Sequence, residues 1–113
     1  MNDNEFKIAK HMSDLNLKGF PKVFSAGFVS NDQPYIIMEL LGLSLKDILK
    51  RSRKHFSIKC VMTIGMQMLD RLEAFHDQGF IHCDIKPDNI LIGNYTDDNK
   101  AMNVLHLIDY GIS

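Results

Sequence analysis

The chain has 113 residues, a length that suits one ordinary domain with a single hydrophobic core. Its 45 % hydrophobic and 24 % charged residues are typical of a soluble globular protein, and the formal net charge of -1 gives no electrostatic reason to expect nucleic acid or an anionic membrane as a partner. The longest apolar stretch, YIIMELLGL, is too short to span a bilayer, and the first residues show no signal-peptide pattern, so we expect an intracellular protein.

The first half of the chain predicts two helices and a pair of strands. From Asn2 to about Leu17 apolar residues recur at near-helical spacing, and Gly19 follows as a breaker. The β-prone runs KVFSAGFVS and PYIIMEL come next, and the intervening NDQP favours a turn, so an antiparallel pair is expected. A short helix is expected from Leu45 to Arg51. The basic cluster KRSRKH is interpreted as its solvated end, with a phosphate-binding patch as the alternative.

The second half predicts a long helix followed by short strands. Ser57 offers an N-cap and Gly79 stands where a left-handed C-cap residue is wanted, so the helix should end at about Asp77. Its central CVMTIGMQML has the pattern of a helix buried on most sides, yet the other elements are too few and too short to cover it. The runs FIH, NILIG and VLHLID are predicted to form three strands, joined by a loop at 82–89 and a polar one at 94–103.

Polar residues capable of chemistry gather in the loop at 82–89 and after the last apolar run. Asp84, Asn89 and Asp109 are oxygen donors of the kind that Mg2+ prefers, and such a site usually takes one or two protein carboxylates together with substrate phosphates. Lys86 could neutralise charge on a transferring phosphoryl group, and Asp84 could orient a hydroxyl and accept its proton. Asp84 and Asn89 alone would more often cap a turn. Their joint spacing with Lys86 and Asp109 instead indicates phosphoryl transfer.

This spacing resembles a known pair of motifs. His82, Asp84, Lys86, Pro87 and Asn89, followed about twenty positions later by DYG, resemble the catalytic loop H-R-D-x-K-x-x-N and the metal-binding motif D-F-G of eukaryotic protein kinases. Lys86 further resembles the serine/threonine kinases. The stretches NEFKIAKHM, MELLGLSLKDIL and HFSIKCVMTIGMQMLDRLEAFHDQGFIH resemble the regulatory helix, the hinge with its following helix, and the long C-lobe helix of the casein kinase 1 family.

The resemblance implies an α+β, protein-kinase-like fold that runs from the regulatory helix of the N-lobe to the DFG-type motif of the C-lobe. Residues 1–41 would form part of the N-lobe and the hinge, and residues 42–113 the first part of the C-lobe. It also implies ATP and Mg2+ as cofactors, protein substrates phosphorylated on serine or threonine in acidic or primed contexts, and a place in the cytoplasm, the nucleus or both. No nucleic-acid or membrane partner is expected.

The same resemblance gives each candidate residue a role. Asp84 would be the catalytic aspartate, Lys86 the phosphate-contacting lysine, and Asn89 and Asp109 the magnesium ligands. The residues that would surround the nucleotide are the regulatory-helix glutamate Glu5, the gatekeeper Met38, the hinge residues Glu39, Leu40 and Leu41, the apolar floor Leu91 and Ile108, and Asp109. His82 is expected to be structural. Glu5 rests on the surrounding resemblance alone, because glutamates are common on exposed helices.

Two positions depart from the kinase pattern. Cys83 stands in place of the usual arginine and Tyr110 in place of phenylalanine, a pair that is also similar to the vaccinia-related kinases, whereas ELLG and KPDN favour casein kinase 1. Because that arginine commonly pairs with a phosphorylated activation loop, its loss predicts activity that does not need such phosphorylation. For Cys83 itself, a small side chain packed against the loop is preferred to a redox role.

Two function classes remain open, and a third is ranked last. The first is an ATP-dependent serine/threonine kinase, for which the chain as given is expected to be an inactive fragment because it contains no glycine-rich loop, no V-A-I-K lysine and no A-P-E motif. Such a fragment is also expected to fold poorly alone, since its long helix would expose apolar side chains. The alternative is a pseudokinase-like or truncated binding module without catalysis. A nucleic-acid-binding domain built on KRSRK lacks both a basic overall charge and interleaved aromatic residues.

Overall fold

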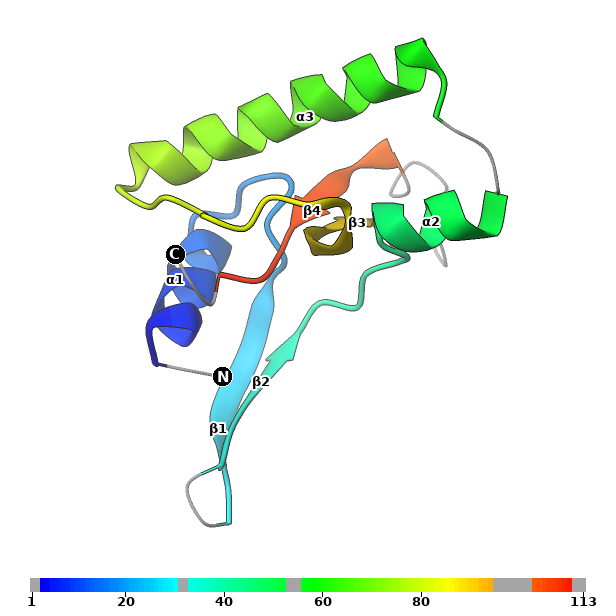
Figure 1. Cartoon of the computed structure of the whole chain (residues 1–113). Helices are drawn as coiled ribbons and strands as arrows, with labels where there is room; N and C mark the ends of the chain where they lie inside the picture. Colours follow the sequence, from blue (N-terminus) through cyan, green and yellow to red (C-terminus); the bar gives the residue numbers. More distant parts are fainter. Residues whose placement is uncertain (1–2, 31–32, 53–55, 95–102, 111–113) are drawn as a thin grey trace.

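The computed structural model describes residues 3–30, 33–52, 56–94 and 103–110. In chain order the elements are α1 (Asp3–Asp14), β1 (Val23–Val29), β2 (Gln33–Met38), α2 (Leu45–Ser52), α3 (Ile58–Asp77), the 3-10 turn η1 (Pro87–Asn89), β3 (Ile90–Ile92) and β4 (Leu105–Leu107). Helix α3 lies along one side of the molecule, and the β1–β2 hairpin projects from the other side (Figure 1). The predicted mixture of helices and small sheets is confirmed.

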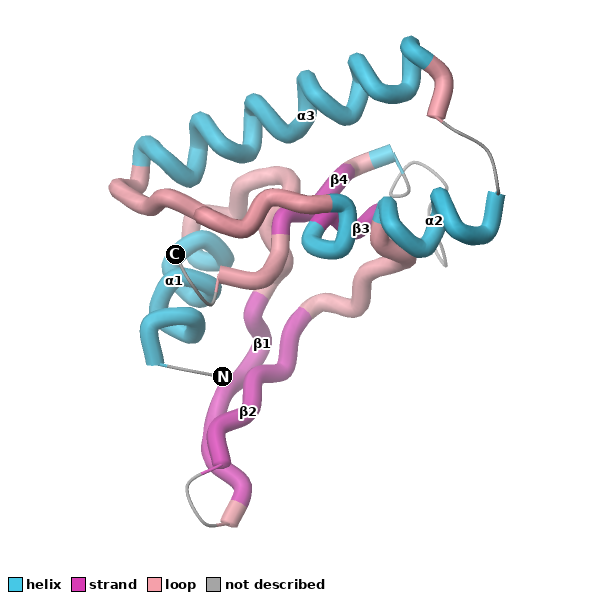
Figure 2. Tube along the Cα trace, viewed as in Figure 1, coloured by secondary structure: helices cyan, strands magenta, loops and turns pink. Residues whose placement is uncertain are grey.

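Two separate antiparallel sheets form, each with two strands. β1 and β2 pair as predicted, with Gly27 opposite Tyr35. β3 and β4 pair over three residues, with Leu91 opposite His106. Figure 2 shows β3 and β4 beside α2 and beneath α3, well away from the tip of the hairpin. The two sheets therefore stand in different surroundings, one inside the body of the molecule and one outside it.

The core lies where α1, the inner face of α3 and the β3–β4 sheet meet. Phe75 of α3 and Leu107 of β4 are both 0 % exposed. The rings of Phe20 and Tyr110 stack on Phe75, with centroids 6.2 and 5.5 Å away. The other buried hydrophobic residues are Ile8, Ala9, Met12, Leu45, Met68, Ile90 and Leu105. Residues from the first and last elements thus share one core.

Helix α1 ends earlier than the apolar periodicity predicted. Asn16 has a φ of 56°, and its N–H donates to the Ser13 carbonyl at 3.0 Å, which closes the helix after Asp14. Asparagine tolerates this left-handed conformation better than most residues do. Leu15 and Leu17, which extended the pattern in the sequence, are exposed.

Both predicted caps of α3 are confirmed. The Ser57 hydroxyl accepts the Cys60 N–H at 3.1 Å, which satisfies one donor of the first turn. At the other end Gly79 has a φ of 84°, and its N–H donates to the His76 carbonyl at 2.9 Å.

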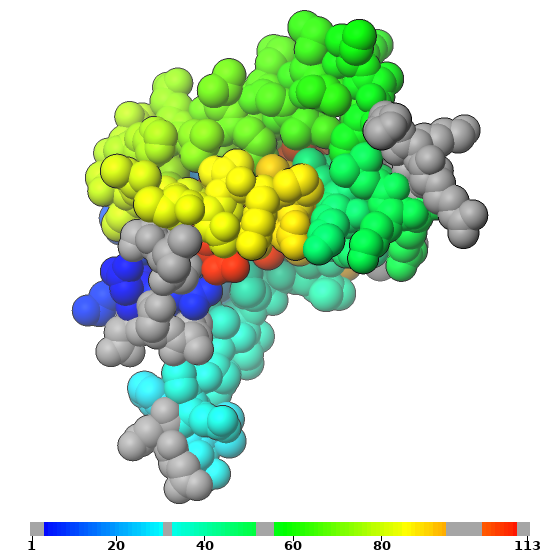
Figure 3. Space-filling view, in the orientation of Figure 1, coloured from blue at the N-terminus to red at the C-terminus, as the bar shows by residue number. Residues whose placement is uncertain are grey.

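Helix α3 buries only one of its faces. Met68, Arg71 and Phe75 face the core. On its outer surface, five large apolar side chains are between 53 % and 80 % exposed: Ile58, Val61, Met62, Met66 and Leu69. Figure 3 shows α3, in green, on the outer rim of the molecule. The expectation that the other elements cannot cover this helix is confirmed, and each uncovered side chain forgoes roughly 1.5–3 kcal/mol of burial. No helix in the described part of the chain is long and apolar enough to cross a membrane.

The run FIH does not form the predicted strand. The Phe80 N–H donates back to the Phe75 carbonyl at 3.3 Å, and the two rings pack with centroids 5.3 Å apart. This apolar run therefore completes the end of α3 and packs against the core, and the Phe80 N–H is not available for a sheet. Strands form within the other two runs, at 90–92 and 105–107. Four other predictions fall partly outside the described residues. They are the turn NDQP at 31–32, the basic cluster KRSRKH at 53–55, the polar loop at 95–102 and the glycine of DYG at 111.

Candidate functional site

The loop at 82–89 leaves α3 and leads into β3, and both of its ends are buried. His82 is 1 % exposed and Asn89 is 5 % exposed. Near the second end, Pro87 opens the short turn η1, and the Asn89 N–H donates to the Lys86 carbonyl at 2.9 Å. The loop is therefore held at both ends while its middle reaches the surface.

Cys83 stands at the start of this loop with a φ of 70°, in the left-handed region. This conformation turns the chain between His82 and Asp84, and the thiol faces solvent. The expectation that Cys83 packs as a small side chain against the loop is wrong, because the turn directs it outward.

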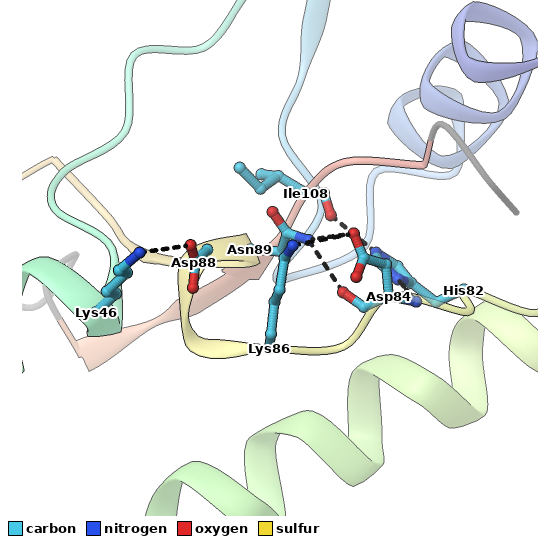
Figure 4. A network of polar contacts seen from close by, with 7 residues as sticks. All are labelled: Lys46, His82, Asp84, Lys86, Asp88, Asn89 and Ile108. Atoms are coloured by element: carbon cyan, nitrogen blue, oxygen red, sulfur yellow. Dashed lines mark hydrogen bonds and ion pairs between the residues drawn. The ribbon is translucent and has the colours of Figure 1, made fainter.

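His82 joins the loop to the segment after β4. Its Nδ1 accepts the Asp84 N–H at 3.1 Å, so the proton of the neutral ring lies on Nε2, which donates to the Ile108 carbonyl at 2.8 Å. The ring also packs against Phe75 and Tyr110, with centroids 5.9 Å away in each case. Both ring nitrogens thus serve the backbone, as expected for a structural histidine (Figure 4).

The peptide groups of Ile108 are held from two sides, and Asp109 follows directly. The Ile108 N–H donates to the Asn89 carbonyl at 3.1 Å, while its carbonyl accepts from His82. Asp109 has a φ of 63°, a conformation that carboxylate residues adopt more readily than most, and such strain gathers at functional sites. The two ends of the loop therefore fix the position from which the Asp109 carboxylate extends.

The three residues predicted to be catalytic lie together in one polar network. Asn89 Nδ2 donates to the Asp84 carbonyl oxygen at 3.0 Å and to the Asp84 carboxylate at 3.3 Å. Lys86 Nζ lies 3.5 Å from the same carboxylate oxygen. The Asp84 side chain keeps 31 % of its surface accessible and that of Lys86 keeps 49 %, so a substrate can reach both. Figure 4 shows the three side chains converging above the loop.

A cavity of about 780 Å³ opens beside this network, between α1, β2, the segment after β2, β3 and the end of β4. It is lined by all eight residues predicted to surround a nucleotide: Glu5, Met38, Glu39, Leu40, Leu41, Leu91, Ile108 and Asp109. Asp84, Lys86 and Asn89 are not among its lining residues, and the Ile108–Asp109 segment connects them to it. The structure thus brings together two groups of predicted residues, and the roles given to them remain predictions.

The hinge segment between β2 and α2 is anchored on both sides of Leu40. The Glu39 N–H donates to the Lys22 carbonyl at 2.8 Å, and the Lys22 N–H donates to Glu39 Oε1 at 3.1 Å. Beyond the hinge, the Gly42 N–H donates to the Ile92 carbonyl at 2.8 Å. Leu40 itself is 76 % exposed. A ligand at the cavity wall would therefore meet backbone that is held in place by β1 and β3.

The cavity has the volume and the lining of a site for a small organic ligand. Most of its wall is apolar, which suits an adenine ring, and its charged groups are three carboxylates, Glu5, Glu39 and Asp109. No lysine or arginine lies among the described residues that line it. Phosphates placed near these carboxylates would need a bound cation, so the lining fits a metal–nucleotide complex better than a nucleotide alone.

Asn89 and Asp109 fit a magnesium ion as a pair. Asn89 uses Nδ2 toward Asp84, so its Oδ1 is the atom that a cation would bind. In the described part of the chain, no three His, Cys, Asp or Glu side chains are grouped as metal ligands. Two protein ligands still suffice, because Mg2+ usually retains waters and takes further oxygens from substrate phosphates.

The sequence interpretation missed several members of the site. Ala9, Pro21, Ile36, Ile37 and Tyr110 also line the cavity. Ala9 follows Glu5 by four residues on α1, so helical periodicity could have placed both on one face. Ile36 precedes Met38 by two residues on β2, so strand alternation could likewise have placed both on one face. Pro21, Ile37 and Tyr110 give no such periodic signal.

An ion pair beside the loop was also missed. Lys46 Nζ of α2 lies 3.2 Å from the Asp88 carboxylate of η1. The hydrogen bond from Lys46 lowers the pKa of Asp88 below its ordinary value of 3.8. Both side chains are about half exposed, so solvent screens the pair and its effect on stability is small. The pair links α2 to the loop.

The sequence matches the model of a known protein family. A family model described as "Protein kinase domain" matches residues 2–113, which is nearly the whole chain. The match includes α1, the hinge, the loop at 82–89 and Asp109.

Proposed function

The chain belongs to the protein kinase domain family, and from that premise we propose that its site serves ATP-dependent phosphorylation of protein serine and threonine residues, in the manner of casein kinase 1. One arrangement carries the proposal. The network of Asp84, Lys86 and Asn89 is hydrogen-bonded to Ile108, and the next residue, Asp109, lies at the wall of the cavity. The casein kinase 1 type is supported by the resemblance of the hinge and of KPDN, and Lys86 supports serine/threonine specificity.

The cavity would bind the nucleotide by its base. Met38, Leu91 and Ile108 supply apolar surface for the adenine ring, and the anchored hinge from Glu39 to Leu41 supplies backbone groups at its edge. A Mg2+ ion bound at this site would supply positive charge to offset the negative charge that develops during transfer. Asn89 Oδ1 and the Asp109 carboxylate would hold that ion.

The loop would act on the protein substrate. The Asp84 carboxylate is accessible and is oriented by Asn89, so it can accept a hydrogen bond from a serine or threonine hydroxyl and take its proton. Lys86 lies near the same carboxylate and can move its ammonium toward the transferring phosphoryl group. Asn89 would therefore have two tasks, since Nδ2 orients Asp84 and Oδ1 would bind the metal.

Two substitutions test these roles in a full-length kinase that carries this sequence, with Asp77→Asn on the exposed end of α3 as the matched control. Asp84→Asn should lower turnover of a casein-like acidic substrate by about 10²- to 10⁴-fold, with little change in Mg-ATP affinity. Asp109→Asn should lower turnover and also weaken metal-dependent nucleotide binding. Single-turnover measurements and nucleotide titrations separate the two effects.

Near wild-type phosphorylation by either variant would contradict the assignment. If the wild-type chain binds Mg-ATP but transfers no phosphate under single-turnover conditions, the site is a nucleotide-binding module without catalysis. Phosphorylation of tyrosine in place of serine or threonine would contradict the specificity drawn from Lys86.

A further inference from the structure

Arg71 is an arginine buried in the core, on the inner face of α3. Its side chain is 3 % exposed, and each guanidinium nitrogen has a partner. Nε donates to the Leu105 carbonyl at 3.1 Å, Nη1 to Asp70 at 2.6 Å, and Nη2 to Gln67 Oε1 at 3.1 Å. A buried cation is costly unless it is paired and hydrogen-bonded. The fold therefore tolerates the buried guanidinium only while these hydrogen bonds are kept.

Gln67, one turn before Arg71, completes the hydrogen bonding of the same stretch of β4. Its Oε1 accepts the Leu105 N–H at 2.9 Å, and its Nε2 donates to the Asn103 carbonyl at 2.9 Å. The two side chains therefore satisfy the backbone edge of β4 that β3 does not use. They take the place that a third strand would occupy in a larger sheet.

The segment after α1 meets β4 at the same place. The Leu107 N–H donates to the Gly19 carbonyl at 2.9 Å. Gly19 has a φ of 90°, and a Cβ added there would lie 1.7 Å from Arg71 Nε, so the guanidinium lies directly against its backbone. Arg71 thus contacts three segments at once: α3, β4 and the chain that follows α1.

Arg71, Gly19 and β4 form a junction, and the segments on both sides of it contribute residues to the cavity. Asp109 follows Leu107 by two residues, and Glu5 lies on α1, whose C-terminal end leads to Gly19. Both carboxylates line the cavity. Because β4 has only three residues, its pairing with β3 alone leaves its position along α3 weakly determined.

We propose that Arg71, assisted by Gln67, is a positioning residue that sets where β4 presents Asp109 to the metal and where α1 stands opposite it. This inference rests on the proposed function, because it assigns Asp109 to the metal. The length and planar fork of arginine are required, since one group must reach the Leu105 carbonyl and Gln67 together while lying against Gly19. A lysine at this position would supply the charge without the fork.

Hydrogen exchange on the whole chain without nucleotide tests whether Arg71 holds β4 in position. In Arg71→Met, the amide protons of Leu105, Leu107 and Ile108 should exchange about tenfold faster or more than in the wild type. The Glu39 and Gly42 amides, which are bonded at the hinge, should change little. The control is Arg51→Met, which removes an exposed arginine from α2. A uniform acceleration of all amides, or unchanged exchange at Ile108, would overturn the proposal.

Nucleotide binding tests the functional part. Arg71→Met should reduce the gain in ATP affinity that Mg2+ provides by about tenfold, while adenosine affinity, which needs no metal, should stay within about twofold. Equal losses for adenosine and Mg-ATP would indicate a merely structural role and overturn the proposal. Arg71→Lys should fall between the wild type and Arg71→Met.

Two further results separate a failure of this proposal from a failure to fold or a failure of the proposed function. If Arg71→Met does not fold, Gln67→Ala decides, because this variant keeps the buried guanidinium, and the loss of the Gln67 hydrogen bonds should give the same local exchange pattern more weakly. If the wild type shows no Mg2+-dependent gain at all, the proposed function fails, and the exchange data still decide whether Arg71 positions β4.

Discussion

The two sheets of this molecule differ in a way that their lengths do not explain. β1 and β2 have seven and six residues, yet most of their side chains are exposed. β3 and β4 have three residues each, yet every residue of β4 is buried. The longer sheet is a hairpin whose turn and β-prone residues are adjacent in the chain. The shorter one exists because α3, Gly19 and the aromatic core surround it.

This difference shows that local sequence controls whether two strands pair, whereas tertiary contacts control how deeply they are buried. Alternation and turn residues decide whether a strand pair forms, whereas burial depends on what packs against it. Substitutions in β1–β2 should therefore have small effects on unfolding free energy, and those in β3–β4 large ones.

The largest difference should appear between Leu107→Ala and Phe28→Ala. Leu107 is 0 % exposed, so its truncation should lower the unfolding free energy by about 2–5 kcal/mol. Phe28 is 69 % exposed, and its truncation should cost no more than about 0.5 kcal/mol. Urea unfolding of both variants measures this. Similar losses for the two would mean that the hairpin is as strongly supported as the β3–β4 sheet.

Gly19→Ala should rank next, because it acts on the junction that supports β4. A side chain at a φ of 90° costs about 1–3 kcal/mol, and the new Cβ would collide with Arg71, which cannot move without breaking one buried and two partly buried hydrogen bonds. The matched control is Gly65→Ala on α3, where an added Cβ meets nothing within 4 Å. That substitution should stabilise the helix by about 0.5–1 kcal/mol. A destabilised control would show that the glycine effect is not specific to the junction.

His106 gives the buried sheet a pH dependence. Burial lowers its pKa from the ordinary value of 6.5, with Glu39 opposing and Arg71 reinforcing the shift, and its Nδ1 bonds to the Val104 carbonyl. The unfolded chain therefore binds more protons as the pH falls below 6.5, and stability should decline there. His106→Asn keeps a side-chain donor and should flatten the unfolding free energy between pH 7 and 5. An unchanged slope in that variant would assign the dependence to other groups.

The smallest effect on stability should come from the hairpin surface. Phe24 is 66 % exposed, and Phe24→Thr retains β propensity, so the unfolding free energy should change by less than about 0.5 kcal/mol. Binding of a hydrophobic dye should fall, because an exposed aromatic ring has been removed. The same replacement at buried Phe20 should unfold the chain, which sets the contrast between surface and core.

The sequence predicted features that depend on neighbours in the chain. The caps at Ser57 and Gly79 and the antiparallel pairing of β1 with β2 follow from short-range rules, and they placed these elements well. The end of α1 and the run FIH were predicted wrongly, because an apolar residue can extend a pattern without belonging to the element. Phe80 illustrates this, since it packs on Phe75 after the helix has ended.

The candidate site was found from the spacing of its polar residues, but its supports were not. Gln67 is a polar residue in the apolar middle of α3, yet its partners Asn103 and Leu105 lie 36 and 38 residues away. Arg71 likewise bonds across 34 residues. Side chains that complete the edge of a distant strand leave no periodic signal, so only the folded chain reveals them.

Tyr110 provides an optical reporter that belongs to the chain itself. The protein contains no tryptophan and three tyrosines, and the Tyr110 hydroxyl is buried and bonded to the Leu107 carbonyl. Burial raises the pKa of Tyr110 above its ordinary value of 10.0, so stability should fall as the pH rises beyond 10, where the unfolded chain ionises first. The phenolate absorbance of Tyr110 should therefore appear only as the core opens, and an alkaline titration would record that opening without any added label.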